Sequence, residues 1–466
     1  MNNSRREFLR ITGTAGFGLA LSSLQDTAPR SSGSNYNMCG HRAPKLETVR
    51  IGFVGLGNRG PQAVLRMNRI AGVAITALCD IREEKVQTAA ASLKGSPHRP
   101  TLYSGSEYAW KKMCDSQDID LIYICTPWHL HTPMALYAMK QGKHVAVEVP
   151  AAKTTDECWQ LVETSEKTKR HCVILENCCY DFFELLTLQL ARQGWLGEIV
   201  HGEGAYIHTL LEGNFSKEKY YQFWRLKENF RNGNLYPTHG IGPVAQVMNI
   251  NRGDQFDYLV SIASADFQMQ QMATELAAKD PAYKEFAGKK FRGNMNTAII
   301  RTHAGRTIML QHDVTSPNVY SRIYKISGTH GSALKYPLPG RLAQGHTNWL
   351  TDTEYKKLEE VHTPALVKHI GAIAKDIGGH GGMDFLMDWR IIDNLRNGLP
   401  MDMDVYDAAA WSVLAPLTGQ SVAQRGRSVN IPDFTRGYWK NDNKPVDLSL
   451  SEGATTGVLP PYTTTR

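Results

Sequence analysis

Three glycines and one aspartate near the start of the chain have the types and spacing needed to hold a nucleotide. Gly55, Gly57 and Gly60 follow the apolar run 49–54 and precede a segment of helical character. Glycine allows the tight turn that brings a pyrophosphate close to the N-terminus of the following helix. Asp80 ends the next apolar run, at the distance of about 20 residues at which dinucleotide-binding folds place an acid.

An acid at this place accepts hydrogen bonds from the ribose hydroxyls and repels a 2′-phosphate, so Asp80 favours NAD over NADP. Arg59 and Arg82 weaken this preference slightly. An alternative remains open, because aspartate is also a common helix N-cap and Asp80 stands just before a helical segment.

The elements that must position these residues alternate between strand and helix. The stretches DLIYICTPWHLHTPMALYAMKQGKHVAVEVP and KTTDECWQLVETSEKTKRHCVILENC each continue this alternation, which predicts a doubly wound parallel sheet. Ligands of such sheets bind outside the carboxyl ends of the strands. The residues at those ends are Asp80, Trp128, His129, Leu130, His131, Glu148, Val149 and Asn177.

Beyond Asn177 the chain becomes rich in strand-forming residues with glycine-containing turns, as in EIVHGEGAYIH and TAIIRTHAGRTIMLQHDVT. We therefore predict an α/β chain: a Rossmann domain over residues 47–177 and an α+β substrate and oligomerisation domain over residues 178–466. The second domain should contain a largely antiparallel open sheet, and its C-terminal helices should return to the first domain.

Residues 1–33 are expected to be a targeting segment and residues 34–46 a linker. The start SRREFLR, with Arg5 and Arg6 ahead of a weakly apolar stretch, resembles the twin-arginine signal by which bacteria export folded proteins. This predicts a periplasmic or exported protein that meets the twin-arginine machinery. An ordinary signal or a disordered basic arm remains the alternative.

Composition limits the other partners. The 52 Lys and Arg against 45 Asp and Glu are spread along the chain without a concentrated basic stripe, which argues against nucleic acid. No stretch after the targeting segment is long and apolar enough to span a bilayer, so the mature protein should be soluble.

Cys79, Cys125 and Cys172 lie in apolar runs and should be buried small hydrophobes. The spacing of Cys178 and Cys179 fits no zinc site, and no His-Glu-x-x-His segment occurs, so we predict no metal.

Over most of its length the mature chain resembles the glucose-fructose oxidoreductase and inositol dehydrogenase family, in which a lysine stands at the position of Val149. Valine cannot take a proton from a sugar hydroxyl. The segments NRG, WHLH, EVP, ENCCY, GNLYPTHGIGPV and GGHGGMDFLMDW resemble, in the same order, the NAD-dependent glycosidases whose known activity is α-N-acetylgalactosaminidase. The missing lysine is then a shared feature of that subgroup.

The resemblance implies a cofactor, a substrate and their contact residues. NAD would contact Asn58 and Arg59 beside the glycines, together with the strand-end residues given above. His239 and Tyr180 would transfer protons, and Glu148 would position the nicotinamide or a sugar hydroxyl. Contacts to a small-molecule glycoside would come from Tyr206, Arg225, Tyr236, Pro237, Thr238, His239 and Tyr320.

The implied reaction removes terminal α-linked N-acetylgalactosamine by oxidation at C3, elimination across C1 and C2, addition of water and re-reduction. NAD ends as it began, which predicts a tightly held cofactor. Two other functions remain open: a net sugar or cyclitol dehydrogenase, and a binding protein that keeps its nucleotide. The sheet of the second domain also offers a face for a homodimer.

Ordinary structural roles remain open for the proposed site residues. His239 could be a turn histidine, Tyr180 and Tyr236 could be packed aromatics, and Glu148 could be a charge at a helix N-terminus. Lys153, four residues after Val149, should face solvent. In GGHGGMDF, Asp384 could cap a helix, and a role for His380 in the pocket is left undecided.

Overall fold

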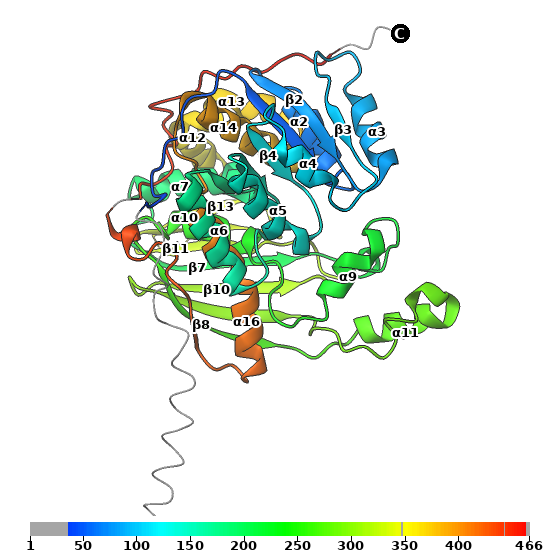
Figure 1. Ribbon diagram of the computed structural model, residues 1–466. Coiled ribbons are helices and arrows are strands. Elements are labelled where there is room, and N and C mark those ends of the chain that lie inside the picture. Colours follow the sequence, from blue (N-terminus) through cyan, green and yellow to red (C-terminus); the bar gives the residue numbers. More distant parts are fainter. Residues whose placement is uncertain (1–35, 346–347, 442, 463–466) are drawn as a thin grey trace, which may run out of the picture. The chain divides into compact units, whose positions relative to one another are not determined.

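The computed structural model describes residues 36–345, 348–441 and 443–462 (Figure 1). All the described residues belong to one compact unit. The predicted twin-arginine segment lies outside the described residues. Residues 36–46, expected to be a linker, form no helix or strand but pack closely, since Met38 and Ala43 are buried and the Met38 amide donates to the Tyr406 hydroxyl at 3.0 Å.

The first domain contains a six-stranded, wholly parallel sheet in the order β3-β2-β1-β4-β5-β6. Every residue of β4 and β5 is buried, as expected for strands covered by helices on both faces. The strands are β1 (Val49–Val54), β2 (Val73–Cys79), β3 (Thr101–Tyr103), β4 (Leu121–Ile124), β5 (His144–Val147) and β6 (Cys172–Ile174). The predicted doubly wound fold is confirmed, and its order reverses between β1 and β4, where ligands of such sheets bind.

Five helices connect these strands within the described residues. The last of them begins with a capping box in which Thr154 and Glu157 satisfy each other's backbone amides, and it ends at Lys169 in the left-handed region. The helices are α2 (Gly60–Met67), α3 (Glu83–Ser92), α4 (Ala109–Asp115), α5 (Trp128–Lys140) and α6 (Thr155–Thr168).

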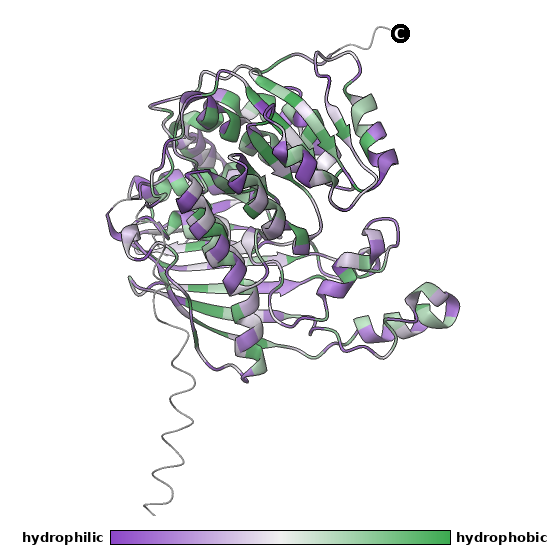
Figure 2. Ribbon diagram, viewed as in Figure 1, coloured by the Kyte–Doolittle hydropathy of each residue, from purple (hydrophilic) through white to green (hydrophobic). Residues whose placement is uncertain are grey.

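The second domain contains an eight-stranded sheet in the order β13-β12-β11-β7-β10-β9-β8-β14. The pair β7 and β10 is parallel and the other neighbouring pairs are antiparallel, which confirms a largely antiparallel sheet. The strands are β7 (Ile199–Ile207), β8 (Phe256–Ala263), β9 (Asn296–Thr302), β10 (Thr307–Asp313), β11 (Tyr324–Gly328), β12 (Gly331–Lys335), β13 (Arg341–Gln344) and β14 (Val429–Asn430). Burial alternates along β9, so helices cover one face and the other is open (Figures 1 and 2).

The C-terminal helices lie against the first domain. Almost all of α14 is buried, and its Asp388 accepts hydrogen bonds from Arg66 Nε at 2.7 Å and from the Tyr123 hydroxyl at 2.8 Å. The helices after β6 are η1 (Asn177–Tyr180), α7 (Phe182–Arg192), α8 (Leu211–Asn214), η2 (Tyr221–Phe223), α9 (Trp224–Glu228), α10 (Thr238–Val247), α11 (Met269–Lys279), η3 (Pro281–Tyr283), α12 (Asp352–His362), α13 (Ala365–Ile377), η4 (His380–Gly382), α14 (Met383–Asn397), α15 (Val405–Ser412), α16 (Leu414–Ala423) and η5 (Tyr438–Lys440).

Two further features bear on the sequence predictions. Among residues 36–345, 348–441 and 443–462, no helix is long and apolar enough to cross a membrane. Cys79 and Cys172 are buried as expected, Cys125 is half-buried, and none of the three forms a disulfide.

Candidate active site

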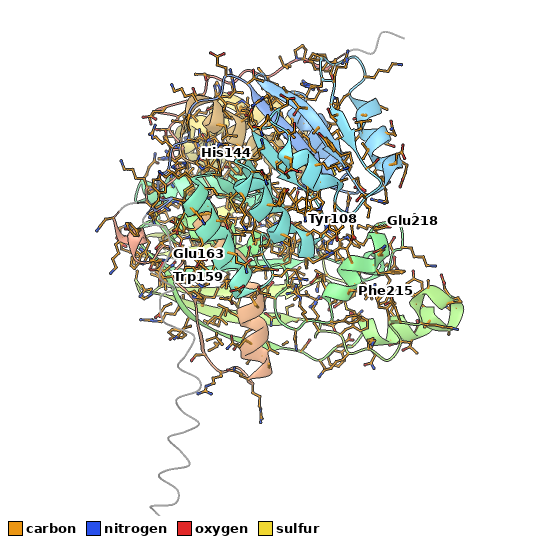
Figure 3. All side chains as sticks on the ribbon, viewed as in Figure 1. Tyr108, His144, Trp159, Glu163, Phe215 and Glu218 are labelled. Atoms are coloured by element: carbon orange, nitrogen blue, oxygen red, sulfur yellow. The ribbon has the colours of Figure 1, made fainter. Side chains whose placement is uncertain are left out.

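A cavity of about 1000 Å³ lies at the carboxyl ends of the first sheet and is lined by both domains. From the first domain come the glycine loop, the end of β2, the start of α5 and the residues after β5. Tyr108, labelled in Figure 3, lines it from the loop before α4. From the second domain come most of residues 219–228, together with Tyr206, Tyr236, His239 and His380.

Two positions of the glycine loop, Gly55 and Gly60, can hold only glycine. Gly55 has φ +90°, and a Cβ there would lie 2.6 Å from the carbonyl carbon of Cys125. A Cβ on Gly60 would lie 2.0 Å from the Gly55 oxygen. Gly55, Gly57, Asn58 and Arg59 line the cavity, whereas Gly60 permits close packing of α2 on its strand. The loop therefore fits a pyrophosphate lying against the backbone, as the spacing predicted.

Asp80 is buried at the end of β2 and lines the cavity. One carboxylate oxygen accepts the Leu56 amide at 2.7 Å, and the other accepts the Arg82 amide at 3.0 Å. The N-cap of α3 is Arg82, with no side-chain cap, so Asp80 is not the helix cap that the sequence left open. Its carboxylate instead joins the glycine loop to the strand end, which is where a ribose would lie.

A charged network closes the next part of the cavity. Arg59 Nε contacts Glu148 at 3.0 Å, and its Nη1 contacts Asp384 at 3.3 Å. Asn177 donates to Asp384 at 2.6 Å, and His380 Nδ1 lies 2.9 Å from the same carboxylate. Burial opposes ionisation of Asp384, yet the His380 hydrogen bond and the Arg59 charge hold its pKa well below the usual range.

This network changes two predictions. The N-cap of α14 is Gly382 and makes no side-chain cap, so Asp384 does not cap this helix, a possibility that the sequence left open. The carboxylate instead holds Arg59 and Asn177, two of the predicted cofactor contacts. His380 lines the cavity and its Nδ1 lies 3.2 Å from Arg59 Nη1, so this histidine does reach the pocket, which the sequence left undecided.

His239 is held by a buried acid that sequence reasoning missed. Its Nδ1 lies 2.7 Å and 2.9 Å from the two oxygens of Glu176, which is fully buried and also accepts the Cys178 amide at 3.0 Å. Burial raises the pKa of Glu176, but the adjacent His239 outweighs it and the pKa is lowered. Because Glu176 occupies Nδ1, Nε2 is the ring nitrogen left for a ligand in the cavity.

Glycines allow the contact between His239 and Glu176. A Cβ on Gly240 would lie 2.6 Å from the Ala205 nitrogen, and a Cβ on Gly242 would lie 3.0 Å from the Glu176 Cγ. The small residues of GIG therefore let α10 approach β7 and place its first turn against Glu176. Pro237 and Thr238, predicted to contact sugar, do not line the cavity; they are the N-cap and the first residue of this helix.

Aromatic rings and one arginine form the wall around His239. Its ring centre lies 4.8 Å from that of Tyr236 and 5.3 Å from that of Tyr206. Arg225 Cζ lies 5.2 Å from the Tyr236 ring and 5.1 Å from the Trp128 ring. The structure thus brings Tyr206, Arg225, Tyr236 and His239 together, with a cation stabilised by ring faces.

Two predicted residues do not join this group. The Tyr180 hydroxyl donates to Asp402 at 3.0 Å, and this buried side chain does not line the cavity, so the geometry gives no support to proton transfer by Tyr180. Tyr320 also lies outside the lining, is 37% exposed and accepts a hydrogen bond from Arg322 at 3.3 Å.

Val149 and the residues near it form the wall of the cavity where a catalytic lysine would otherwise stand. Val149 is buried and lines the cavity without offering a base. Lys153 also lines the cavity, and its Nζ pairs with Glu228 at 2.6 Å, so the expectation that it faces solvent is wrong. His131 is buried between the carbonyl oxygens of Pro150 and Thr126 and fixes this loop, and it lines the cavity together with His129 and Leu130.

One group in the described part of the chain has metal-ligating atoms close together. These atoms of Glu176, Cys178 and His239 all lie within 4.8 Å of one another. Burial raises the pKa of the Cys178 thiol well above its usual value, so it is a poor ligand, and Glu176 is already engaged by His239. The absence of a metal stays a prediction.

Known proteins resemble both halves of this chain. Residues 49–175 match the family described as oxidoreductase family, NAD-binding Rossmann fold, and residues 180–441 match glycosyl hydrolase 109, C-terminal domain. A glycosyl hydrolase family 109 protein of Solibacter usitatus is 45% identical over 447 residues, which cover 95% of this chain and 99% of the relative. The alpha-N-acetylgalactosaminidase of Bacteroides fragilis is 46% identical over 416 residues, covering 87% and 96%.

Solved structures show the same fold at low identity. Levoglucosan dehydrogenase in complex with NADH has a TM-score of 0.59 and 17% identity, covering 83% of this chain and 100% of the other. The myo-inositol dehydrogenase of Lactobacillus casei, in complex with NAD(H) and myo-inositol, has a TM-score of 0.56 and 15% identity, covering 83% and 99%. The glycine loop and Asp80 are thus part of an NAD-binding Rossmann domain.

Proposed function

The chain belongs to glycosyl hydrolase family 109, and we propose that it releases terminal α-linked N-acetylgalactosamine from a glycoside. The observation that carries this proposal is the pair formed by His239 and Glu176, set between an aromatic wall and the nucleotide-binding loop. The relative of that name, 46% identical, supports the choice of sugar.

The proposed route is oxidation at the sugar C3, elimination of the C1 substituent, addition of water and re-reduction. NAD, when bound, supplies the hydride acceptor and returns the same hydride. The chain itself must move protons. Nε2 of His239 takes one proton from the sugar and later returns it, while Glu176 stabilises the protonated imidazole ring through Nδ1. This pair supplies a base where Val149 offers none.

The remaining residues position the two ligands. Glu148, held by Arg59 at 3.0 Å, would orient the nicotinamide or a sugar hydroxyl, and Asn177 would act from the same edge. The faces of Tyr206 and Tyr236 suit a sugar ring, which presents C–H groups on one side. Arg225 would donate to a polar substituent of that ring.

A cofactor restored in each turnover has no need to exchange, and we propose that NAD is held tightly. Residues 219–228 support this, since they line the cavity from the second domain and the Tyr221 ring lies 4.9 Å from Arg82 Cζ, beside Asp80. Such a cofactor could be bound in the cytoplasm and carried to the periplasm inside the folded protein, through the twin-arginine machinery. We also propose a homodimer through the open face of the second sheet, which exposes Ile262 and Ile299.

Proton NMR in D2O tests the reaction. The purified protein, without added NAD, should release the aglycone from an aryl α-N-acetylgalactosaminide and place deuterium at sugar C2, with no net NADH. Replacement His239→Ala should abolish turnover while sugar binding remains. Equal sugar binding without turnover in the wild type would instead favour a binding protein.

A net dehydrogenase is the second candidate, because levoglucosan dehydrogenase shares this fold. Stoichiometric NADH with an intact glycosidic bond would establish it. Val149 does not separate the two candidates, since both begin with the same oxidation at C3; the family and the relative that is 46% identical favour the glycosidase.

A further inference from the structure

A second cavity, of about 430 Å³, lies along α2. Helix α2, the end of α3, the segment between α13 and α14 and the C-terminal residues Pro461 and Tyr462 all contribute to its lining. Its volume falls within the range of about 300–1,000 Å³ that small-molecule sites occupy. We call it the α2 cavity. It has the size of a ligand site and a position separate from the proton-transfer pair.

The C-terminal segment is fixed against the end of α2. The Leu459 amide donates to the Arg69 carbonyl oxygen at 2.8 Å, and Arg69 Nε donates to the Leu459 carbonyl oxygen at 2.7 Å. Figure 1 shows this segment running past α2 on its way to the C-terminus. Pro461 and Tyr462 follow directly, so the wall that they form is held in place by the backbone before them.

The charges that line the α2 cavity do not balance. Its four fixed cations are Arg59, Arg66, Arg69 and Lys94, and the only carboxylate of its lining, among the described residues, is Asp384. Asp384 lies 3.3 Å from Arg59 Nη1 and 3.4 Å from Arg66 Nη1. This acid is therefore shared between two arginines and leaves the other two cations uncompensated.

Two acids beyond the lining are engaged in the same way. Glu148 pairs with Arg59 Nε at 3.0 Å, and Asp388 pairs with Arg66 Nε at 2.7 Å. Neither acid makes an ion pair with Lys94 or the Arg69 guanidinium. The positive charge left over around the cavity thus belongs to these two side chains.

Arg69 and Lys94 have no acidic partner in the part of the chain that the structure describes. The side chain of Arg69 makes one hydrogen bond there, from Nε to Leu459, so its two Nη groups are left for a ligand. Lys94 is exposed, two residues after the last residue of α3. Arginine binds phosphate and sulfate oxygens through paired N–H groups, and lysine binds them as a point charge. A tetrahedral oxyanion is therefore the chemistry that both side chains favour.

The remaining lining suits a ring attached to that oxyanion. Leu65 is 40% exposed on α2 and lines the cavity together with Ile377, Pro461 and Tyr462. A bare phosphate ion would fill only a small part of the 430 Å³. An ester would place its anionic group on the two cations and its ring beside these apolar and aromatic side chains.

We propose that the α2 cavity binds the phosphate or sulfate ester of a ring compound of monosaccharide size. The site is independent of the proposed glycosidase reaction, because neither His239 nor Glu176 lines it. Arg59 and His380 line both cavities, so one wall separates this ligand from the nucleotide. Arg69 and Lys94 bind the oxyanion.

Isothermal titration calorimetry tests this on the whole protein with saturating NAD, which keeps the glycine loop occupied. The probes are glucose 6-phosphate, glucose 6-sulfate, inorganic phosphate and glucose, all at one ionic strength. At least one ester should bind about tenfold more tightly than inorganic phosphate and than glucose. The ester that binds more tightly identifies which of the two anions the site takes.

Two variants locate the binding. Arg69→Gln should weaken binding of the ester about 10- to 100-fold, as for loss of a hydrogen bond to a charged group. Lys94→Gln should weaken it about two- to fivefold, as for an exposed ion pair, and keeps the test valid if Arg69→Gln folds poorly. Arg427→Gln, at an exposed residue outside both cavity linings, is the matched control and should bind as the wild type does.

Three results would overturn the proposal. The first is an ester that binds no more tightly than glucose. The second is an affinity unchanged in both Arg69→Gln and Lys94→Gln, which would place the ester elsewhere on the protein. The third is inorganic phosphate binding as tightly as both esters, since the apolar wall would then hold no ring.

Discussion

Glu176→Gln should nearly abolish turnover while leaving the fold and the cofactor in place. Both carboxylate oxygens lie within 2.9 Å of His239 Nδ1, and Glu176 itself is fully buried. A hydrogen bond to a charged group contributes about 1.5–3 kcal/mol, so its loss when His239 is protonated should slow the reaction about 10- to 100-fold.

The amide adds a second effect. Its oxygen can keep the hydrogen bond from the Cys178 amide, which turns the NH2 group toward Nδ1 of His239. That reversal favours the tautomer with the proton on Nε2, which cannot act as a base toward the cavity. The same exchange behind a catalytic histidine of serine proteases lowers kcat by about 10⁴. Taken together, the two effects should lower kcat/KM by a factor of about 10² to 10⁴.

The assay is kcat/KM on an aryl α-N-acetylgalactosaminide across pH, together with Tm and the NAD released on denaturation. Glu176 does not line the cavity, so NAD content should stay unchanged. Glu184→Gln is a matched buried control, since Glu184 accepts a hydrogen bond from Arg322 at 2.8 Å and lies outside the cavity lining, so it should leave kcat/KM nearly unchanged. Glu176→Gln with more than a third of wild-type activity would refute the assigned role of this pair.

Three further predictions concern the scaffold and the cofactor. Gly240→Ala should lower the free energy of unfolding by about 1–3 kcal/mol, seen as a lower Tm, because its Cβ would meet the Ala205 nitrogen at 2.6 Å. Asp80→Ala should reduce NAD retained through dialysis, and unchanged retention would exclude a ribose contact. Burial lowers the pKa of His144 to about 3 and that of His171 well below its usual value, so the unfolded chain binds more protons below about pH 6.5. Tm should therefore fall as pH is lowered from 7 to 5, and a flat profile would contradict neutral burial.

The first domain was predictable because its signals are local. Glycine spacing, buried strand runs and an acid at a strand end each lie within a few residues, and they also located Trp128 and Glu148 at the cavity. The order of the second sheet was not predictable, because β7 pairs with β10 and β11 through contacts about 100 residues apart in sequence.

The prediction of the site residues failed where the direction of a side chain decides whether it reaches the cavity. Tyr180 follows Asn177 by three residues, but its hydroxyl turns to Asp402, 222 residues away. Glu176 was missed although it stands beside Asn177, because nothing in ENCCY reveals that His239 will meet it. The role of Asp384 stayed undecided because the arginine that engages it lies 325 residues earlier.

The position of α14 has a consequence for biosynthesis. Arg66, in the first helix of the nucleotide fold, is buried and meets Asp388 only after a further 322 residues have been made. A buried charge whose partner is removed destabilises a protein by about 3–5 kcal/mol. The nascent N-terminal half therefore holds an arginine with no counterion when it leaves the ribosome. The nucleotide-binding half therefore gains the stability of this ion pair only after α14 has been synthesised and has packed against it.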